Sequence, residues 1–503
     1  EKSASYYTPD VLTRCLVDHA LREILPGKTA DEILKLTICE PAMGSAAFLN
    51  EAVNQLAEAY LQKKQQELKE AGADVQTIGH DQYMAERQRV KMYIADNNVY
   101  GVDLNPVAVE LAEVSLWLNA ISQGGHVPWF GLQLVVGNSL VGARREVFEV
   151  SPNQADPRSP ADAKAKESWY DNRKELTQAL AFSETPELSG PEPDSAARGV
   201  RRIFHFLLPA EGMGNVSDKV VKGLEPERFD AFRAWRRNFI RPLTRKEFQR
   251  VQRLSVAVDR LWKQHAKELA KVRAATSDDL HVWPDEAPNR TPTTTAQKDH
   301  LYQTEMLSKA QKNASPYRRL KLVMDFWCAL WFWPLTDADH LPSMEDWLFI
   351  LEGVLHGNDI LVLQQEEGLA QNVPSGDECT VGETPDMFAA ESVAEPAAGI
   401  ELHRDNFGYV DLEVLSQLPA LQVVEQVAGQ QRFLHWELEF ADIFQTRGGF
   451  DLVLGNPPWI KVEWNEQGLL SDFDPRFSIR NLNAKQTADS REKVFDAMPK
   501  ARE

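Results

Sequence analysis

Short apolar runs alternate with longer amphipathic stretches over the first 150 residues of the chain. The apolar runs at 36–39, 98–102 and 132–136 predict three buried strands. Apolar side chains at helical spacing predict helices over 10–24, from 47 to beyond 61, and over 107–121. In the first of these helices, one buried side is predicted from Val11, Leu12, Cys15, Leu16, His19 and Ala20. The alternation of strand and helix predicts a parallel sheet with crossover helices.

A fourth apolar run lies far along the chain, at residues 452–454, and it ends in a stiff turn. Gly455 stops the strand, and Asn456-Pro457-Pro458-Trp459 follows at its carboxyl end. The two prolines give up two N–H donors, so the turn is rich in carbonyl acceptors. Acceptors beside an aromatic face suit a planar base that carries an amino group. A strand that merely ends in a proline turn is the equally weighted alternative.

The residues between these two regions predict a long insertion. Residues 151–197 are rich in Pro, Ser, Asp and Ala and predict a linker, whereas 204–273 and 300–363 carry helical patterns. Residues 364–400 are acidic and predict a long loop. We therefore divide the chain into a first part at 1–150, a mainly helical insertion at 151–430, and a return at 431–503.

Composition narrows the class of protein without defining it. The chain has 503 residues, 43% hydrophobic and 26% charged, and no apolar run of the ~18 residues that a membrane span needs. Its four cysteines have no paired spacing, which argues against a zinc site and against a disulfide framework. Unpaired cysteines fit a protein of the reducing cytoplasm.

The net charge of −20 is unevenly distributed. Residues 198–273 hold nineteen Lys and Arg against eight acids, while 322–403 hold sixteen acids and no Lys or Arg. Local charge governs contact with phosphates, so the basic segment predicts either a surface along DNA or a solvated helical face. The tryptophans at 327–347 are expected to be core residues.

Polar or small residues follow each predicted strand, at the edge where open α/β sheets bind ligands. The loop Glu40-Pro41-Ala42-Met43-Gly44-Ser45-Ala46 lacks both the Gly-x-Gly-x-x-Gly and the Gly-Lys-Ser/Thr patterns. Its acid can instead receive an ammonium group, unless the loop is an ordinary strand-to-helix turn. Asp103 can accept two ribose hydroxyls or simply cap the next helix. Asn138 can contact an adenine edge or form a plain turn.

Taken together, these motifs resemble the N6-adenine-specific DNA methyltransferases of restriction-modification and phage-defence systems. The nearest forms are the type IIG-like, BREX-associated and DISARM-associated methylases. The motifs appear in the order Tyr-Tyr-Thr-Pro, Glu-Pro-Ala-Met-Gly-Ser-Ala-Ala-Phe-Leu, Gly-Val-Asp-Leu-Asn-Pro, Gly-Asn-Ser-Leu and Asn-Pro-Pro-Trp. They cover residues 1–150 and about 432–465. The resemblance implies a Rossmann-like α/β sheet that binds S-adenosylmethionine, incomplete in this chain and interrupted by the helical insertion.

The resemblance also assigns roles to individual residues. The catalytic turn would comprise Asn456, Pro457, Pro458 and Trp459. The cofactor would be held by Tyr7, Thr8, Pro9, Glu40, Pro41, Ala42, Gly44, Ser45, Phe48, Asp103, Leu104 and Asn138. Two departures from the family pattern are Met43, where Cys is usual, and Ala46, where Gly is usual. Trp459 stands where Tyr or Phe is commoner and keeps a stacking face.

The implied reaction is methyl transfer to N6 of an adenine flipped out of double-stranded DNA, with no metal and no covalent intermediate. We expect a prokaryotic cytoplasmic enzyme without a membrane segment, acting alone or with other subunits of a defence system. Only four sheet strands can be placed, so the rest of the sheet and a DNA-recognition domain are expected beyond Glu503. Two alternatives remain open: a methyltransferase acting on RNA or on protein glutamine, and a non-catalytic cofactor-binding subunit.

Overall fold

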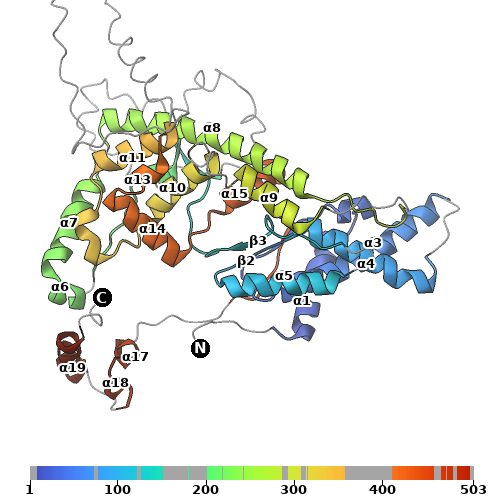
Figure 1. Ribbon diagram of the computed structural model, residues 1–503, viewed down its shortest axis with the longest axis horizontal. Helices are drawn as coiled ribbons and strands as arrows, with labels where there is room; N and C mark the ends of the chain where they lie inside the picture. The colour runs from blue at the N-terminus through green and yellow to red at the C-terminus, as the bar shows by residue number, and fades with distance from the viewer. Residues whose placement is uncertain are drawn as a thin grey trace, which may run out of the picture.

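The structure is a computed structural model in which a small parallel sheet and its helices lie beside a larger helical body (Figure 1). It describes residues 8–72, 78–121, 126–150, 179–180, 201–217, 219–241, 243–285, 293–306, 313, 315–356, 410–457, 466–471, 473–479 and 484–498. All structural statements below concern these residues. Tyr7, Pro458 and Trp459 lie outside them.

The parallel sheet has four strands in the order β3-β2-β1-β7. Its strands are β1 (Ile38–Glu40), β2 (Val99–Asp103), β3 (Leu134–Val136) and β7 (Leu452–Val453). All four were predicted from the apolar runs. Strand β1 pairs with β2 on one side and with β7 on the other, so the strand order reverses between β1 and β7. In open α/β sheets, ligands bind at such a reversal, outside the carboxyl ends of the strands.

Five helices accompany the first three strands (Figure 1). They are α1 (Asp10–Ile24), α2 (Ala30–Ile33), α3 (Ala47–Glu70), α4 (His80–Asn97) and α5 (Pro106–Ala120). The start of α5 follows from its sequence, because the Asn105 side chain accepts a hydrogen bond from Val107 N at 3.1 Å and Pro106 occupies the first turn. The predicted bounds of α1, α3 and α5 agree with the structure to within about one residue at each start.

The predicted buried side of α1 is wrong. The helix buries Thr13, Val17 and Leu21, while Val11 remains 79% exposed. The buried residues recur every four positions, as helix geometry requires, but Thr13 is polar and was not counted. Its hydroxyl donates to Pro9 O at 3.2 Å, which removes the cost of burying it.

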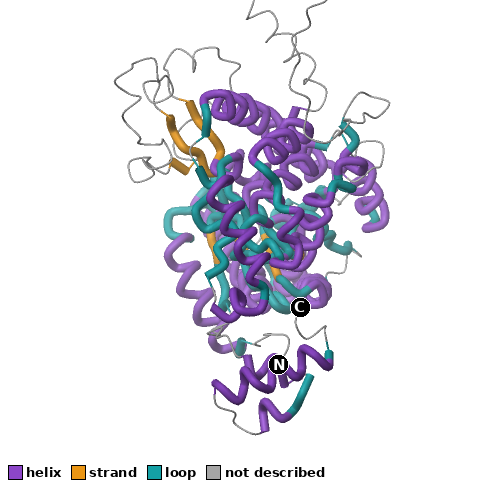
Figure 2. The backbone as a smooth tube through the Cα atoms, turned by 90° about the vertical axis from the view of Figure 1, so that its left-hand side faces the viewer, coloured by secondary structure: helices purple, strands orange, loops and turns teal. Residues whose placement is uncertain are grey.

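The insertion forms the second body, and it contains an antiparallel sheet that the sequence did not predict. Strand β4 (Glu146–Val150) pairs with both β5 (Ala179–Leu180) and β6 (Arg201–Phe204), seen as the orange strands at the upper left of Figure 2. Val147 packs in the same hydrophobic core as the insertion helices. The insertion body therefore already begins before residue 150.

The remaining insertion elements are helical, as predicted. They are the 3-10 helices η5 (His205–Leu207) and η6 (Leu335–His340) and the α-helices α6 (Lys219–Leu224), α7 (Pro226–Phe239), α8 (Arg245–Thr276), α9 (Thr295–Met306), α10 (Pro316–Ala329), α11 (Met344–His356), α13 (Leu412–Leu415) and α14 (Pro419–Gln431). Helix α8 begins with a capping box formed by Thr244 and Glu247. Trp333 and Trp347 are buried in the core as expected, whereas Trp331 is 40% exposed.

Part of the basic charge of the insertion is neutralised within the protein. Arg250 on α8 pairs with Glu345 and Glu352 at 2.7 Å, and both acids belong to the segment that lacks Lys and Arg. Arg273 pairs with Asp442 at 2.5 Å. These arginines therefore serve the internal structure, while Lys263, Lys267 and Lys271 of α8 stay exposed.

After the insertion, the chain returns to the sheet through α15 (Trp436–Glu439) and α16 (Ala441–Arg447). Asp451 then anchors β7 beside β1, because its Oδ2 accepts from Thr37 N at 2.8 Å and from Thr37 Oγ1 at 2.9 Å. Helices α17 (Glu466–Ser471), α18 (Arg476–Ile479) and α19 (Ala484–Ala497) pack on one another and lie apart from both bodies in Figure 1.

A buried charge cluster joins the first part of the chain to the insertion. Lys298 Nζ lies 2.6 Å from Asp278 Oδ2 and 4.0 Å from Asp96 Oδ1, and the Lys298 side chain is 0% exposed. His126 Nε2 lies 3.4 Å from Asp278 Oδ2. Asp96, His126 and Asp278 offer atom types that bind divalent metals, but the Lys298 ammonium already supplies a cation among them. Asp96, His126, Asp278 and Lys298 therefore form a buried ion cluster that links the two bodies, which we call the ionic joint.

Candidate functional site

Two predicted cofactor loops meet at the carboxyl ends of β1 and β2, and Asp103 connects them. One carboxylate oxygen of Asp103 accepts from Gly44 N at 2.9 Å, and the other accepts from Asn105 N at 2.8 Å. Asp103 thus fixes the loop after β1 and the turn before α5 together. Because each carboxylate oxygen has two lone pairs, further acceptor capacity remains for a ligand hydroxyl.

The loop after β1 contains two residues with left-handed backbone. Gly44 has φ 53°, and Ala46 has φ 62° and ψ 40°. This conformation costs little for glycine but disfavours residues with a Cβ, which explains why glycine is usual at the position of Ala46. Met43, the other departure, is accommodated because β2 has Gly101 opposite: a Cβ there would lie 2.3 Å from Met43 Sδ.

Replacing Gly44 with alanine is expected to destabilise the protein by about 1 kcal/mol. A Cβ at this position meets no atom within 4 Å, so backbone strain alone produces the loss. Gly429 is the matched control, because it lies inside α14 and is equally open. Gly429→Ala should stabilise by about 0.5–1 kcal/mol through helix propensity. Thermal unfolding of both variants measures the difference, and equal shifts in the same direction would contradict the assignment.

Glu40 ends β1 as a buried acid, only 2% exposed. Burial raises its pKa well above the ordinary range, and the charge of Asp103 raises it further, whereas the hydrogen bond from Leu49 N lowers it. That bond joins Leu49 N to Glu40 Oε2 at 3.3 Å. No Lys or Arg of the described residues pairs with Glu40. A cation from outside the chain would therefore favour the ionised form of Glu40 and gain an electrostatic partner when the carboxyl releases its proton.

The turn after β7 lies against the loop after β1 and next to the start of α1. A Cβ built on Gly455 would lie 3.5 Å from Pro41 Cδ and 3.8 Å from Glu40 Cγ. Asn456 Nδ2 donates to Thr8 Oγ1 at 3.4 Å, and both Asn456 and Pro457 are exposed. The structure thus brings the Thr8-Pro9 segment and the Asn456-Pro457 segment together across 448 positions of sequence.

Asn138 follows β3 at the same edge of the sheet. Its Oδ1 accepts from Leu140 N at 3.1 Å, which is the plain turn considered from the sequence. Its backbone N–H donates to Arg432 O at 2.7 Å. The sequence did not indicate Arg432, since no local motif surrounds it and its contacts lie about 300 positions away.

The other predicted cofactor residues divide by exposure. Pro41, Ala42, Gly44 and Ser45 are half-buried, and Leu104 is 51% exposed. Phe48, in contrast, is 2% exposed and packs in the core beneath the sheet. Contact between Phe48 and a ligand stays a prediction. The predicted roles of Tyr7, Pro458 and Trp459 concern residues outside the described part of the chain.

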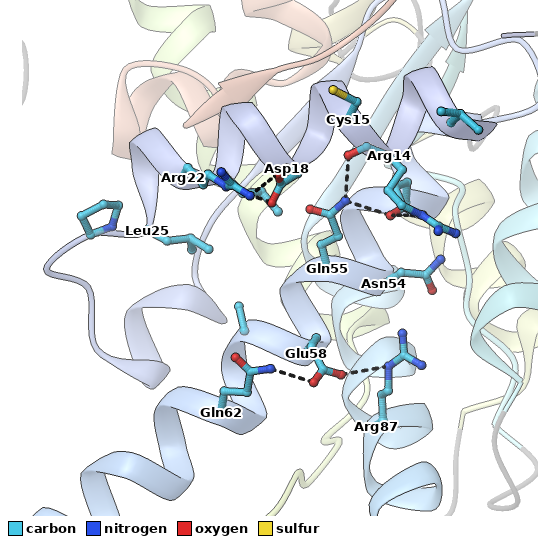
Figure 3. A pocket seen from close by; sticks show the side chains of 15 residues that line it. Arg14, Cys15, Asp18, Arg22, Leu25, Asn54, Gln55, Glu58, Gln62 and Arg87 are labelled. Carbon is cyan, nitrogen blue, oxygen red and sulfur yellow. Dashed lines mark hydrogen bonds and ion pairs between the residues drawn. The ribbon is translucent and has the colours of Figure 1, made fainter. Parts of the chain in front are cut away.

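A groove on the described residues lies away from these strand ends. It has a volume of about 1120 Å³, opens between α1, α3 and α4, and includes Arg14, Gln55 and Glu58 (Figure 3). Charged and amide side chains dominate its lining, and several bond to one another, as Gln55 Nε2 does to Glu51 Oε1 at 2.8 Å. None of the predicted site residues lines this groove. The candidate site is therefore defined by the strand ends rather than by this groove.

Comparisons with known proteins show which protein class this chain resembles. Residues 357–496 match the family described as Eco57I restriction-modification methylase, and the match includes β7 and Asn456-Pro457. The predicted resemblance to restriction-modification methyltransferases is thereby confirmed.

A particular relative supports the same class. A protein of Methanocaldococcus jannaschii, named as a type II restriction enzyme and methyltransferase, is 33% identical over 133 residues. The aligned region covers 25% of this chain and 10% of that protein, so the chain spans only a small part of its relative. No solved structure matches the chain significantly. Among the described helices, none combines the length and the apolarity of a membrane span.

Proposed function

We propose that the chain carries the cofactor half and the catalytic turn of an S-adenosylmethionine-dependent DNA methyltransferase that acts on N6 of adenine. The proposal includes a Rossmann-like sheet and a role in restriction-modification or phage defence. The observation that carries it is the position of Asn456-Pro457. This pair follows Gly455, which lies against Glu40-Pro41 at the reversal of the strand order, and Asn456 donates to Thr8.

The residues at this edge suit the proposed cofactor. Glu40 is a buried acid without a cationic partner among the described residues, and it fits the ammonium group of a methionine moiety. Asp103 retains acceptor capacity for ribose hydroxyls. Leu104, half-exposed next to it, and Asn138 offer an apolar and an amide surface for a purine ring. When bound, S-adenosylmethionine would supply an electrophilic methyl group.

Asn456 and Pro457 would supply two hydrogen-bond acceptors for the hydrogens of the adenine amine. The N6 lone pair of adenine is delocalised into the ring, so the amine is a poor nucleophile. The Asn456 side-chain oxygen and the Pro457 carbonyl would accept its two hydrogens, which favours a more tetrahedral nitrogen with an available lone pair. Both residues are exposed, so an extruded base can approach them. Trp459 would provide the stacking face, worth roughly 1–3 kcal/mol per base.

Cofactor affinity should rise with pH because of Glu40. Its raised pKa keeps the carboxyl protonated in the free protein at pH values above the ordinary 4.5, while an ammonium ligand favours the ionised form. Below the raised pKa, binding must therefore release a proton, and affinity increases by up to about tenfold per pH unit until that pKa is passed. Calorimetric titration of S-adenosylmethionine across pH measures this slope. Glu40→Gln should abolish it, and an unchanged slope in that variant would contradict the role.

The proposed function is tested by methyl transfer from labelled S-adenosylmethionine with the full-length protein. DNA, RNA and protein are offered separately, and modified bases are identified by mass spectrometry. N6-methyladenine formed in DNA is the expected result. Label in RNA or in glutamine would replace the proposed substrate, and cofactor binding without transfer to any of the three would favour a non-catalytic subunit.

A further inference from the structure

Arg432 occupies an unusual backbone position where the insertion ends. It caps the carboxyl end of α14 with φ 52° and ψ 52°. Among the described residues, Arg432 and Ala46 are the non-glycine residues with positive φ. Such a conformation costs about 1–2 kcal/mol for a residue with a Cβ, so the surrounding contacts must hold it.

Those contacts tie Arg432 to both strand ends that the cofactor is proposed to bridge. The guanidinium Nη1 donates to Leu104 O, directly after Asp103. The main-chain carbonyl of Arg432 accepts from Asn138 N at 2.7 Å. One residue directly after the insertion thus bonds to the turn after β2 with its side chain and to the turn after β3 with its backbone.

The chain after Arg432 continues the same attachment. Phe433 forms a parallel bridge with Asn138, Leu434 N donates to Val141 O at 3.0 Å, and Trp436 Nε1 donates to Ser139 O at 3.0 Å. This segment is well fixed along the residues that follow β3, so its attachment does not depend on Arg432 alone. The contact with Leu104 is different, because among the described residues the bond from the Arg432 side chain is the hydrogen bond that joins this segment to the turn after β2.

We infer that Arg432 is a positioning residue for cofactor binding, which fixes the turn at Leu104 relative to Asn138. Strand pairing already holds Asp103 beside Val136, and Gly137 N donates to Asp103 O at 2.9 Å, so Arg432 acts on the turn just beyond the sheet. The inference rests on the proposed function. A ligand that contacts ribose and purine at once requires both strand ends at fixed spacing, and pre-organisation of that spacing increases affinity. The end of the insertion then affects the cofactor site, since the residue that caps its last helix, α14, positions the turn at Leu104.

Three variants of the full-length protein separate the side chain from the backbone strain. Arg432→Ala removes the bond to Leu104 and keeps the strained conformation. Arg432→Gly also removes the bond but relieves the strain, so it should unfold at a higher temperature than Arg432→Ala. Arg432→Lys keeps a donor. The matched control is Arg236→Ala, because Arg236 is an insertion arginine that also donates to a backbone carbonyl, that of Glu211, remote from the strand ends.

The readouts are the dissociation constant of S-adenosylmethionine and the steady-state constants on DNA. Arg432→Ala and Arg432→Gly should both weaken cofactor binding on the order of tenfold, the effect of losing one hydrogen bond that orders the site. Arg432→Lys should recover part of the affinity. The KM for S-adenosylmethionine should rise while kcat and the KM for DNA stay within about twofold, and Arg236→Ala should change none of them.

Cofactor affinity unchanged in Arg432→Gly would overturn the inference while leaving the proposed function intact. An equal loss of kcat and of DNA affinity in Arg432→Ala, matched by Arg236→Ala, would assign Arg432 a general structural role and would also overturn it. Failure of the wild-type protein to bind S-adenosylmethionine would instead overturn the proposed function itself. The two failures are therefore distinguishable.

Discussion

Asn456→Ala is expected to lower the methyl-transfer rate on DNA by at least about a hundredfold, the order found when a positioned hydrogen-bond group is removed from a catalytic site. The side chain is exposed just after β7, and its Nδ2 donates to Thr8 Oγ1 at 3.4 Å. Its loss removes the acceptor proposed to hold an N6 hydrogen, and the side chain that is removed is exposed. Cofactor affinity and thermal stability should therefore stay near those of the wild type.

Single-turnover kinetics with pre-bound DNA measures this rate directly. Asn456→Asp keeps an acceptor oxygen and should retain more activity than Asn456→Ala. Asn215→Ala removes an exposed asparagine of the insertion and serves as the matched control. Methyl transfer at the wild-type rate in the Asn456→Ala variant would contradict the catalytic role proposed for Asn456, whatever the effect of the substitution on stability.

Lys298→Met is expected to destabilise the protein by about 3–5 kcal/mol, the usual result of removing one partner from a buried ion cluster. Asp278 and Asp96 are 8% and 3% exposed at their side chains, and Lys298 Nζ lies within 4.0 Å of both. Without the ammonium, two carboxylates face one another in a poorly solvated joint. Methionine keeps the length and apolar contacts of the lysine stem, so the loss reports mainly on charge.

Denaturant unfolding measures this effect, and a second variant tests its origin. Asp278→Asn combined with Lys298→Met should lose much less than the sum of the two single changes. Arg22→Met is the matched control, because Arg22 pairs with Asp18 at 2.7 Å on an exposed face, where ion pairs contribute about 0–1 kcal/mol. Similar losses for Lys298→Met and Arg22→Met would show that the joint contributes no more than a surface pair.

The strands of the sheet were predictable because their signals are local. An apolar run that ends at Glu40 or Asp103 specifies both a buried strand and the acidic side chain at its carboxyl end, and the run before Gly455 specifies the strand β7. Parallel pairing then places those strand ends along one edge, so the meeting of two predicted loops at Asp103 followed from pattern alone. The hydrogen bond that Gly44 N donates to the Asp103 carboxylate joins residues 59 positions apart and was not predicted, although it holds the loop after β1.

The structural features that were not predicted from the sequence depend on contacts outside the local pattern. The buried side of α1 was misjudged because Thr13, a polar residue, faces the core where its hydroxyl bonds to Pro9 O. The antiparallel pairing of β4 with β6 joins residues about fifty positions apart, and neither strand has a distinctive pattern. Arg432 contacts Leu104 across 328 positions, and an arginine in a polar helix end gives no hint of such a partner.

The separation of β1 and β7 along the chain has a consequence for how the protein acquires its fold. Thr37 and Asp451 meet across 414 positions, so the sheet has very high contact order at the strand pair that carries the candidate site. The first three strands can associate early during synthesis, whereas β7 must wait until the whole insertion has emerged. A folded insertion brings Arg432 to the end of β3 and thereby shortens the search that β7 must make. We therefore expect the edge with the candidate site to be the last part of the sheet to form, and variants that slow insertion folding to delay it further.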